Sequence, residues 1–201
     1  MSSEKKPLVR TKKDFKIVSE KTVYNGYLQV KSYNVSYQRF EGGWSQELSR
    51  EVLMRGDVAG VLLYDPDLNK VVLIEQFRIG AIEDKKTPWL LECVAGILDA
   101  NESIEELAIR ETREEAGMEI LELHPICSYW CSPGAYSERV HLFCGRVDST
   151  KASGVHGLEE EGEDIKVHVI KSEKAFEMVR NGEINHALSI IALQWLELNY
   201  K

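Results

Sequence analysis

The chain has 201 residues, of which 43% are hydrophobic and 29% are charged, a composition typical of globular proteins. Its formal net charge of -8 makes nucleic acid a poor partner, because binding to a phosphate backbone needs a basic surface. No run approaches 18 apolar residues and no apolar segment follows the charged N-terminus, so the sequence predicts neither a membrane span nor a secretion signal. Four cysteines without a metal-binding pattern indicate reduced, mostly buried thiols and a cytoplasmic location.

The first quarter of the chain favours β-structure. Between residues 16 and 54, β-prone segments alternate with the turn signals YNG and EGG. The second signal predicts a long hairpin of strands near 29–40 and 44–54. A hairpin buries little apolar surface by itself, so it must pack against the rest of the chain or against a second copy. We therefore expect residues 1–54 to form a small N-terminal antiparallel β domain.

Residues 55–201 are expected to form the larger domain. Apolar, β-branched runs on both sides of a DPDLN turn predict a buried hairpin, and further strands and two closing amphipathic helices follow. The class is α+β with mostly antiparallel strands. The predicted strands are 58–64, 70–78, 89–96, 121–130, 138–147 and 164–170, and the closing helices are 172–182 and 185–200.

Two later segments carry more specific expectations. The Gly-rich, acidic segment 148–163 predicts a long mobile loop, and loops of that length inside compact domains are often functional. The last helix is expected to bury one apolar side. The residues on that side are Ala187, Ile190, Ile191, Leu193 and Leu196.

The strongest helix signal spans residues 104–116. Ser103 and Glu106 form a capping box, and a glycine follows the helix where a left-handed C-cap belongs. At 100° per residue, Glu111 and Glu115 fall on the same stripe as the apolar residues of the helix. Two carboxylates that face a core are unfavourable unless an arginine or a divalent cation meets them. An ordinary ion-paired surface helix is the alternative reading.

The spacing around this helix resembles the Nudix box. Gly96 is followed after five residues by Glu102, and after seven more by RETREEAGM, which begins at Arg110. One departure is Thr112, where the family usually has an aliphatic residue, and we expect only a change in packing there. The resemblance implies a Nudix α/β/α sandwich with a mixed sheet from about residue 55 onward.

The family resemblance also implies hydrolysis of a nucleoside diphosphate linked to another group, with Mg²⁺ or another divalent cation such as Mn²⁺ as cofactor. Oxygen ligands suit such hard cations. The metal ligands carried over are Glu111, Glu115 and the backbone carbonyl of Ala95. Glu114 is a further metal or structural candidate, and the pair Glu102 and Arg110 is expected to form a structural ion pair.

A second motif narrows the resemblance. Pro133 lies sixteen residues after Gly117 within SPGAYSERVHLF, which resembles the bacterial ADP-ribose pyrophosphatase subfamily. This likeness extends over nearly the whole chain and implies cleavage of ADP-ribose to AMP and ribose 5-phosphate. It carries over Glu161 as the catalytic base and Glu163 as a further metal ligand. Glu159 and Glu160 on the same loop remain competitors for the base, and so does Glu114.

The subfamily resemblance also implies a substrate site and a homodimer that exchanges its N-terminal strands, in which Tyr27 serves the partner's site. Arginine suits both phosphate and adenine, by forked hydrogen bonds and by stacking. Surface ion pairing would explain any single arginine of the expected site equally well, so the prediction of a substrate site depends on all of its residues together. The expected substrate-binding residues are Tyr27, Leu28, Arg50, Glu51, Arg55, Arg78, Ile97, Ser132, Pro133, Gly134 and Glu138.

Two other functions fit the same motifs. One is a pyrophosphatase for a different nucleoside diphosphate sugar, such as ADP-glucose or GDP-mannose, because sugar selectivity depends on a few contacts. The other is a sensor that binds ADP-ribose without cleaving it. Such proteins usually lose carboxylates of the box, whereas every one is present here.

Overall fold

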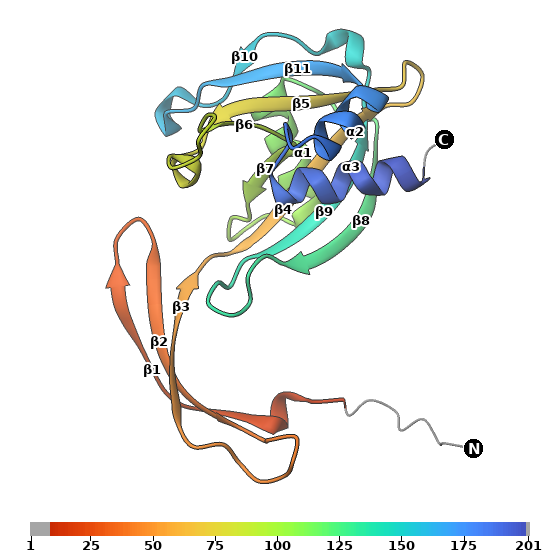
Figure 1. Cartoon of the computed structure of the whole chain (residues 1–201). Helices are drawn as coiled ribbons and strands as arrows, with labels where there is room; N and C mark the ends of the chain where they lie inside the picture. The colour runs from red at the N-terminus through yellow and green to blue at the C-terminus, as the bar shows by residue number, and fades with distance from the viewer. Residues whose placement is uncertain (1–8, 200–201) are drawn as a thin grey trace, which may run out of the picture. The chain divides into compact units, whose positions relative to one another are not determined.

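The computed structural model describes residues 9–199 and divides the chain into two compact units (Figure 1). The first unit contains the chain up to Arg55 together with the segment Cys131–Glu138. The second contains Gly56–Trp130 and the chain from Arg139 onward. The division falls one residue after the expected domain boundary. The sequence did not indicate that Cys131–Glu138 associates with the N-terminal strands.

Three antiparallel strands make up most of the first unit, in the order β1 (Phe15–Asn25), β2 (Gln29–Tyr37) and β3 (Leu48–Met54). A short 3-10 helix, η1 (Lys12–Asp14), precedes them. The expected hairpin across EGG is confirmed, with shorter strands than predicted. Every residue of β1 is exposed, so the part of the chain that the structure describes covers neither face of this strand.

The segment Cys131–Glu138 lies along the end of β3. Leu53 N–H donates to the Ala135 carbonyl (2.9 Å), and Ser137 N–H donates to the Leu53 carbonyl (3.1 Å). The Ser137 hydroxyl also donates to the carbonyl of Arg55 (2.9 Å). These bonds place the SPG turn and Glu138 beside Arg55 within the first unit.

The second unit is built around one mixed sheet. Within the described residues this sheet has eight strands, in the order β10-β11-β5-β4-β9-β8, with β6 paired to β5 and β7 paired to β4. The pair β4 and β9 is parallel, and the other pairs are antiparallel. The strand bounds are β4 (Asp57–Asp65), β5 (Lys70–Phe77), β6 (Trp89–Glu92), β7 (Val94–Ile97), β8 (Glu122–Trp130), β9 (Arg139–Arg146), β10 (Val155–His156) and β11 (Ile165–Lys171).

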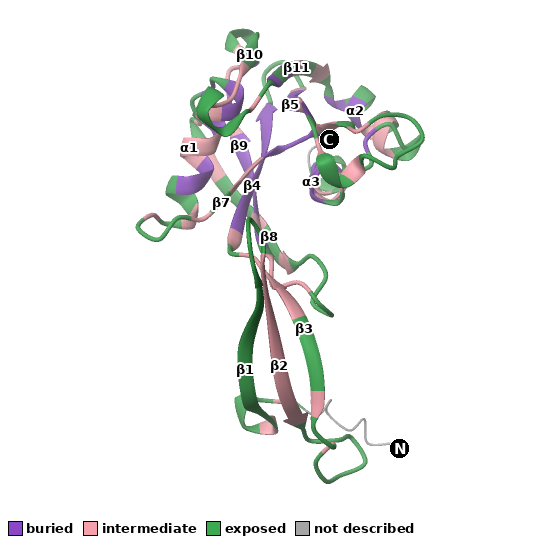
Figure 2. Ribbon diagram, turned by 90° about the vertical axis from the view of Figure 1, so that its left-hand side faces the viewer, coloured by how far each residue is buried: buried purple, intermediate pink, exposed green. Residues whose placement is uncertain are grey.

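Helices cover both faces of this sheet, as the α/β/α expectation requires (Figure 2). Helix α1 (Ile104–Ala116) packs with Val61, Leu63 and Ile74 on one face. Helices α2 (Ser172–Arg180) and α3 (Ala187–Asn199) pack with Leu62 and Leu73 on the other. Because successive residues of a strand point to opposite faces, the apolar runs of β4 and β5 feed both cores. The predicted α+β class and sandwich architecture are confirmed.

Two local predictions were wrong. The expected strand 89–96 is broken at Cys93, because its first half pairs with β5 and its second half with β4. The expected loop 148–163 is more regular than predicted. It contains the 3-10 turns η3 (Ser149–Lys151) and η4 (Glu159–Glu161), as well as β10. A further 3-10 turn, η2 (Ile79–Ala81), follows β5.

The buried side of α3 also differs from the prediction. Ala187 is exposed, whereas Leu188, Ser189 and Ala192 are buried together with the predicted Leu193 and Leu196. This helix is apolar around most of its circumference, so periodicity alone does not identify the face that packs.

The cysteines are free, as expected, but only two of them are buried. Cys93 and Cys144 lie in the core, whereas Cys127 and Cys131 are exposed, which corrects the prediction of mostly buried thiols. Alternation along β8 and the position of the 131–138 loop expose these two side chains. Among the described helices, none combines the length and apolar character needed to cross a bilayer.

Candidate active site

Helix α1 begins and ends where its sequence predicted. Glu106 N–H donates to the Ser103 hydroxyl (3.2 Å), and Ser103 N–H donates to the Glu106 carboxylate (2.7 Å), which completes the capping box. Gly117 ends the helix in the left-handed region with φ of 62°. Because both ends are held by local groups, the helix presents its carboxylates at defined positions.

Glu111 and Glu115 project from the packed side of α1, as predicted. Glu115 is buried and its Oε2 accepts a hydrogen bond from Ala95 N–H (3.0 Å), which joins the helix to β7. Glu111 is half-buried and lies directly over Gly96, where an added Cβ would collide with its carboxylate. The glycine of the box is therefore required by the close approach of the helix to this strand.

The surroundings of both carboxylates disfavour their charged forms. Burial raises the pKa of Glu111 to about 7, against the attraction of Arg110 and with repulsion from Glu114. Burial raises the pKa of Glu115 to about 8, with repulsion from Glu111, although the hydrogen bond from Ala95 acts in the opposite direction. Buried carboxylates with raised pKa values are typical of functional sites.

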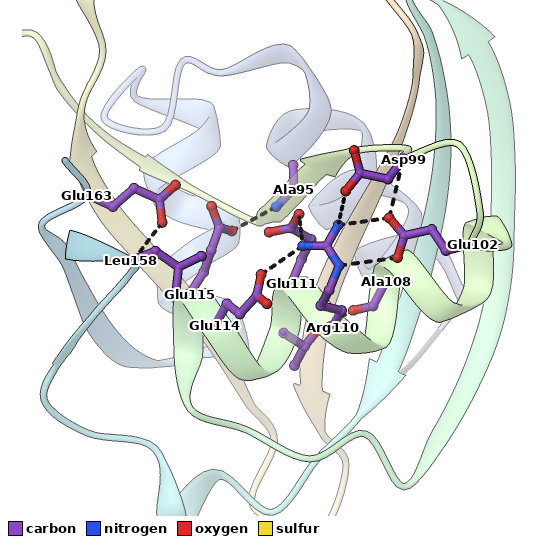
Figure 3. Close-up of polar contacts among 11 residues, drawn as sticks. Ala95, Asp99, Glu102, Ala108, Arg110, Glu111, Glu114, Glu115, Leu158 and Glu163 are labelled. Atoms are coloured by element: carbon purple, nitrogen blue, oxygen red, sulfur yellow. Dashed lines mark hydrogen bonds and ion pairs between the residues drawn. The ribbon is translucent and has the colours of Figure 1, made fainter. Parts of the chain in front are cut away.

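Arg110 stands at the centre of a carboxylate network on the outer side of this pair (Figure 3). Its Nε and Nη2 donate to the two oxygens of Glu102 (3.2 and 2.8 Å), which confirms the predicted ion pair. Its Nη1 donates to Glu111 (3.0 Å) and to Glu114 (2.8 Å). The hydrogen bonds from Arg110 lower the pKa of Glu102, and in return the guanidinium pKa is raised. The positive charge of Arg110 thus offsets part of the negative charge of Glu111. The carboxylate of Glu115 depends on other groups.

Thr112 does not disturb the helix. It is fully buried, and its hydroxyl donates to the carbonyl of Ala108 one turn earlier (2.7 Å). The substitution for an aliphatic residue is therefore accommodated by a backbone hydrogen bond, in agreement with the prediction of a packing change.

The acidic segment before β11 approaches the C-terminal end of α1. Gly157 N–H donates to the Glu114 carbonyl (3.0 Å), and an added Cβ at Gly117 would collide with the ring of His156. Glu163 Oε2 accepts from Leu158 N–H (3.0 Å), and its charge raises the pKa of both Glu111 and Glu115. The structure therefore brings Glu163 into the electrostatic range of the box carboxylates.

Glu161 is placed differently from Glu163. It belongs to the exposed 3-10 turn η4, together with Glu159 and Glu160, and its backbone N–H donates to the Leu158 carbonyl (3.0 Å). The turn ends at Gly162 in the left-handed region with φ of 71°. The three neighbouring glutamates share the same exposure, so the structure does not distinguish among them as base candidates.

The donor set suits a hard cation, although the protein alone does not enclose one. Within residues 9–199, no three His, Cys, Asp or Glu side chains are gathered closely enough to hold a metal ion. Mg²⁺ commonly uses one or two protein carboxylates and completes its shell with water and substrate phosphates. Glu111 and Glu115, whose pKa values are raised, match that requirement, because a cation would favour their charged forms.

One group near the site was missed by the sequence interpretation. Arg78 Nε donates to Glu92 (2.7 Å), whose other oxygen lies 3.3 Å from Nδ1 of His186, just before α3. Glu92 is 1% exposed. The available signal was a single carboxylate inside the apolar run WLLECVAG, which is unusual for a buried strand.

The remaining predicted substrate residues divide between the two units. Ile97, at the end of β7, belongs to the second unit and is exposed. The others belong to the first unit, where Tyr27 is 92% exposed in the turn between β1 and β2. The predicted residues of the first unit are Tyr27, Leu28, Arg50, Glu51, Arg55, Ser132, Pro133, Gly134 and Glu138.

Within the first unit, the loop after β8 gathers polar groups around Glu138. The Tyr136 hydroxyl donates to Glu138 (2.7 Å), the Cys131 thiol donates to its other oxygen (3.0 Å), and Arg55 Nε lies 3.9 Å away. Burial raises the pKa of Tyr136 and of Cys131 to about 12, so both keep their protons. Arg55 Nε is buried without a hydrogen-bond partner among the described residues, and Tyr136 was not predicted.

Comparison with known proteins places these features in a family. Residues 54–187 match the NUDIX domain. An ADP-ribose pyrophosphatase of Haemophilus influenzae is 45% identical over 193 residues, which cover 94% of this chain and 89% of that protein. A GDP-mannose pyrophosphatase of Escherichia coli is 32% identical over 187 residues, covering 92% and 95%. The crystal structure of an ADP compounds hydrolase shares the fold, with a TM-score of 0.69 and 18% identity over 96% of this chain and 99% of that one.

Proposed function

This chain belongs to the NUDIX family, as its box indicated, and we propose that it hydrolyses the pyrophosphate of ADP-ribose to AMP and ribose 5-phosphate. The observation that carries the proposal is the pair of Glu115, which is buried, and Glu111, which is partly buried, with raised pKa values and positions beside Ala95 and Gly96. The substrate is inferred from the ADP-ribose pyrophosphatases that the chain resembles along nearly its full length.

We propose Mg²⁺ as the cofactor, held by Glu111, Glu115, Glu163 and the carbonyl of Ala95, with Glu114 as a further candidate. When bound, the ion would stabilise the negative charge of the diphosphate. The carboxylates supply hard oxygen ligands, and the side chain of Glu111 keeps 13% of its surface exposed. Mn²⁺ has similar ligand preferences and is the expected substitute.

The attacking water needs a base, and Glu161 is the proposed group. Its exposed position on η4 leaves the carboxylate accessible to water and to a substrate. Glu159, Glu160 and Glu114 are the competing assignments. Arg78 would bind phosphate oxygens through its guanidinium.

The first unit would contribute the other substrate contacts. Arg55 Nε is buried and has no hydrogen-bond partner among residues 9–199, although it lies 3.9 Å from Glu138, which is itself held by Tyr136 and Cys131. A hydrogen-bonding group left unpaired in the protein is suited to a polar ligand. Tyr27 is exposed enough to stack on an adenine, for which an aromatic face is well suited.

A panel of substrates tests this proposal. Purified protein is incubated with Mg²⁺ and ADP-ribose, ADP-glucose or GDP-mannose, and a phosphatase releases inorganic phosphate from the monoester products. We expect ADP-ribose to have the highest kcat/KM. A higher kcat/KM for GDP-mannose would favour the second candidate, which the 32% identical relatives support. Binding of ADP-ribose without phosphate release would instead indicate a sensor.

We also propose a homodimer that exchanges its N-terminal strands. The whole of β1 is exposed, and Tyr27 and Phe40 are 92% and 88% exposed. A small sheet whose apolar side chains stay exposed gains stability when a second copy covers them. Size-exclusion chromatography with light scattering should give twice the 22.9 kDa chain mass. A monomer at micromolar concentration would refute the dimer.

A cytoplasmic location fits this proposal. The four cysteines are free thiols, and two of them are exposed, which suits a reducing compartment. Fractionation of cells that produce the protein should therefore recover it with cytoplasmic markers.

A further inference from the structure

The contact between Arg78 and Glu92 has features that an ordinary surface ion pair lacks. Glu92 is almost completely buried at the end of β6, whereas the side chain of Arg78 is 40% exposed. Moving a carboxylate out of water is costly, and a single hydrogen-bonded ion pair often fails to recover that cost. Replacing such a pair by apolar residues frequently stabilises a protein. Stability alone therefore gives a weak reason for a glutamate at this position.

Glu92 holds Arg78 in a particular orientation. The bond from Arg78 Nε measures 2.7 Å, and the backbone N–H of Arg78 donates to the Pro88 carbonyl (2.9 Å) on the segment leading into β6. Both the main chain and the side chain of Arg78 are thus held by the same neighbouring segment. Because only Nε is bonded to Glu92, the Nη1 and Nη2 groups have no hydrogen-bond partner among the described residues.

The guanidinium held in this way lies near the box carboxylates. The positive charge of Arg78 acts on Glu115 and opposes the effect of burial on its pKa. Two free Nη donors on one edge of a guanidinium match the spacing of two phosphate oxygens. His186 contacts the second oxygen of Glu92 at 3.3 Å and also lies 3.2 Å from the Ser189 hydroxyl at the start of α3. The carboxylate is therefore supported from two sides.

We infer that Glu92 is a positioning residue, which keeps the Nη groups of Arg78 directed at the diphosphate of the substrate. This role rests on the proposed function, because it requires a phosphate ligand for Arg78. Glu92 itself is buried and does not touch the substrate. Glu92 restricts the side chain of Arg78 before the substrate binds. Arg78 therefore loses less conformational entropy on binding than a freely rotating exposed arginine would.

Two substitutions separate positioning from packing. Glu92→Leu keeps the volume and removes the acceptor, whereas Glu92→Gln keeps an acceptor for Arg78 Nε and removes the charge. We expect Glu92→Leu to raise the KM for ADP-ribose about 10-fold with kcat much less affected, since a displaced binding group acts mainly on substrate affinity. Glu92→Gln should recover most of that loss. A residue that only fills space would show the opposite order, with Leu as the better replacement.

The affinity for ADP with Mg²⁺, measured by calorimetry, gives a readout that needs no turnover. It should weaken in Glu92→Leu by a similar factor. In an Arg78→Ala background, Glu92→Leu should cause no further loss, because both changes remove the same interaction. The matched control is Glu119→Leu, which removes an exposed glutamate paired with Arg113 at 2.8 Å and should leave KM and ADP affinity unchanged.

The outcomes separate this inference from the proposed function. If the wild type binds ADP in a Glu92-dependent manner but does not cleave ADP-ribose, the proposed function fails and the positioning role stands. If the wild type cleaves ADP-ribose but Glu92→Leu leaves KM and ADP affinity unchanged, the inference is overturned. Additive losses of Glu92→Leu and Arg78→Ala would also overturn it. If Glu92→Leu does not fold, the double variant Arg78→Ala, Glu92→Gln is compared with Arg78→Ala alone. An ADP affinity and a KM equal to those of Arg78→Ala support the inference, and a further loss refutes it.

Discussion

Glu115→Gln should have opposite effects on stability and on catalysis. Glu115 is buried with its pKa raised to about 8, so at neutral and higher pH the folded protein holds an unfavourable charge or an extra proton. Glutamine has the same shape, and its amide oxygen can still accept from Ala95 N–H, as Glu115 does at 3.0 Å. The metal-free variant should therefore be more stable than the metal-free wild type at high pH, while its turnover is nearly abolished.

The pKa difference sets the magnitude. A carboxyl group whose folded pKa lies above its unfolded pKa destabilises the protein as pH rises between the two values. Here the ordinary value is 4.5 and the folded value is about 8. At about 1.4 kcal/mol per pKa unit, the full difference gives an upper limit of about 5 kcal/mol. Because the new amide N–H also needs a partner, we expect a gain of about 2–4 kcal/mol at pH 9 and almost none at pH 4.

The assay is urea unfolding in EDTA at several pH values between 4 and 9, for both proteins. The free energy of unfolding of the wild type should fall through this range, and that of Glu115→Gln should fall less. Added Mg²⁺ should stabilise the wild type more than the variant, by linkage between binding and folding. Glu119→Gln is the control, because its carboxylate is exposed and ion-paired with Arg113. A variant that is less stable than the wild type at every pH, or that retains near-normal turnover, would refute the assigned role of Glu115.

Three further changes probe the rest of the site. Glu161→Gln should lower kcat by about 10²–10⁴ with little change in KM, because a lost base impairs the chemical step more than binding. If Glu161→Gln were fully active and Glu160→Gln inactive, the base would be Glu160 instead of Glu161. Glu163→Gln should be rescued in part by excess Mg²⁺, and a titration that shows no rescue would argue against a metal ligand. Gly96→Ala should lower activity strongly, since the added Cβ collides with the Glu111 carboxylate. Wild-type kcat/KM would show that this close contact is not needed.

Helix α1 shows how much of the site is encoded locally. Its start at Ser103, its end at Gly117 and the burial of Glu115 all follow from residues within one or two turns. Hydrogen bonds at helix ends and a 3.6-residue period involve only near neighbours, so a sequence pattern is sufficient to predict them. The Glu102–Arg110 ion pair was expected from the family resemblance, and seven residues lie between its members.

The contacts around Glu92 show what local patterns do not contain. Arg78, Glu92 and His186 come from three segments that meet only because β5 pairs with β6 and the chain returns before α3. The break at Cys93 has the same origin, since β6 and β7 pair with different strands. The period of the apolar pattern predicts which residues of a strand or helix face a core. It does not predict which residue of another element lies opposite each of them.

The sequence by itself determined the family, the α+β class, the caps of the box helix and the identity of its buried carboxylates. The tertiary structure alone decided that Gly96 must be small, that Glu163 rather than Glu161 lies within electrostatic range of the box, and that Glu92 holds Arg78. It also decided that Cys131–Glu138 joins the N-terminal strands. The physical reason is that caps and helix faces depend on neighbours in sequence, whereas burial energies and charge pairing depend on groups that folding brings together from distant positions.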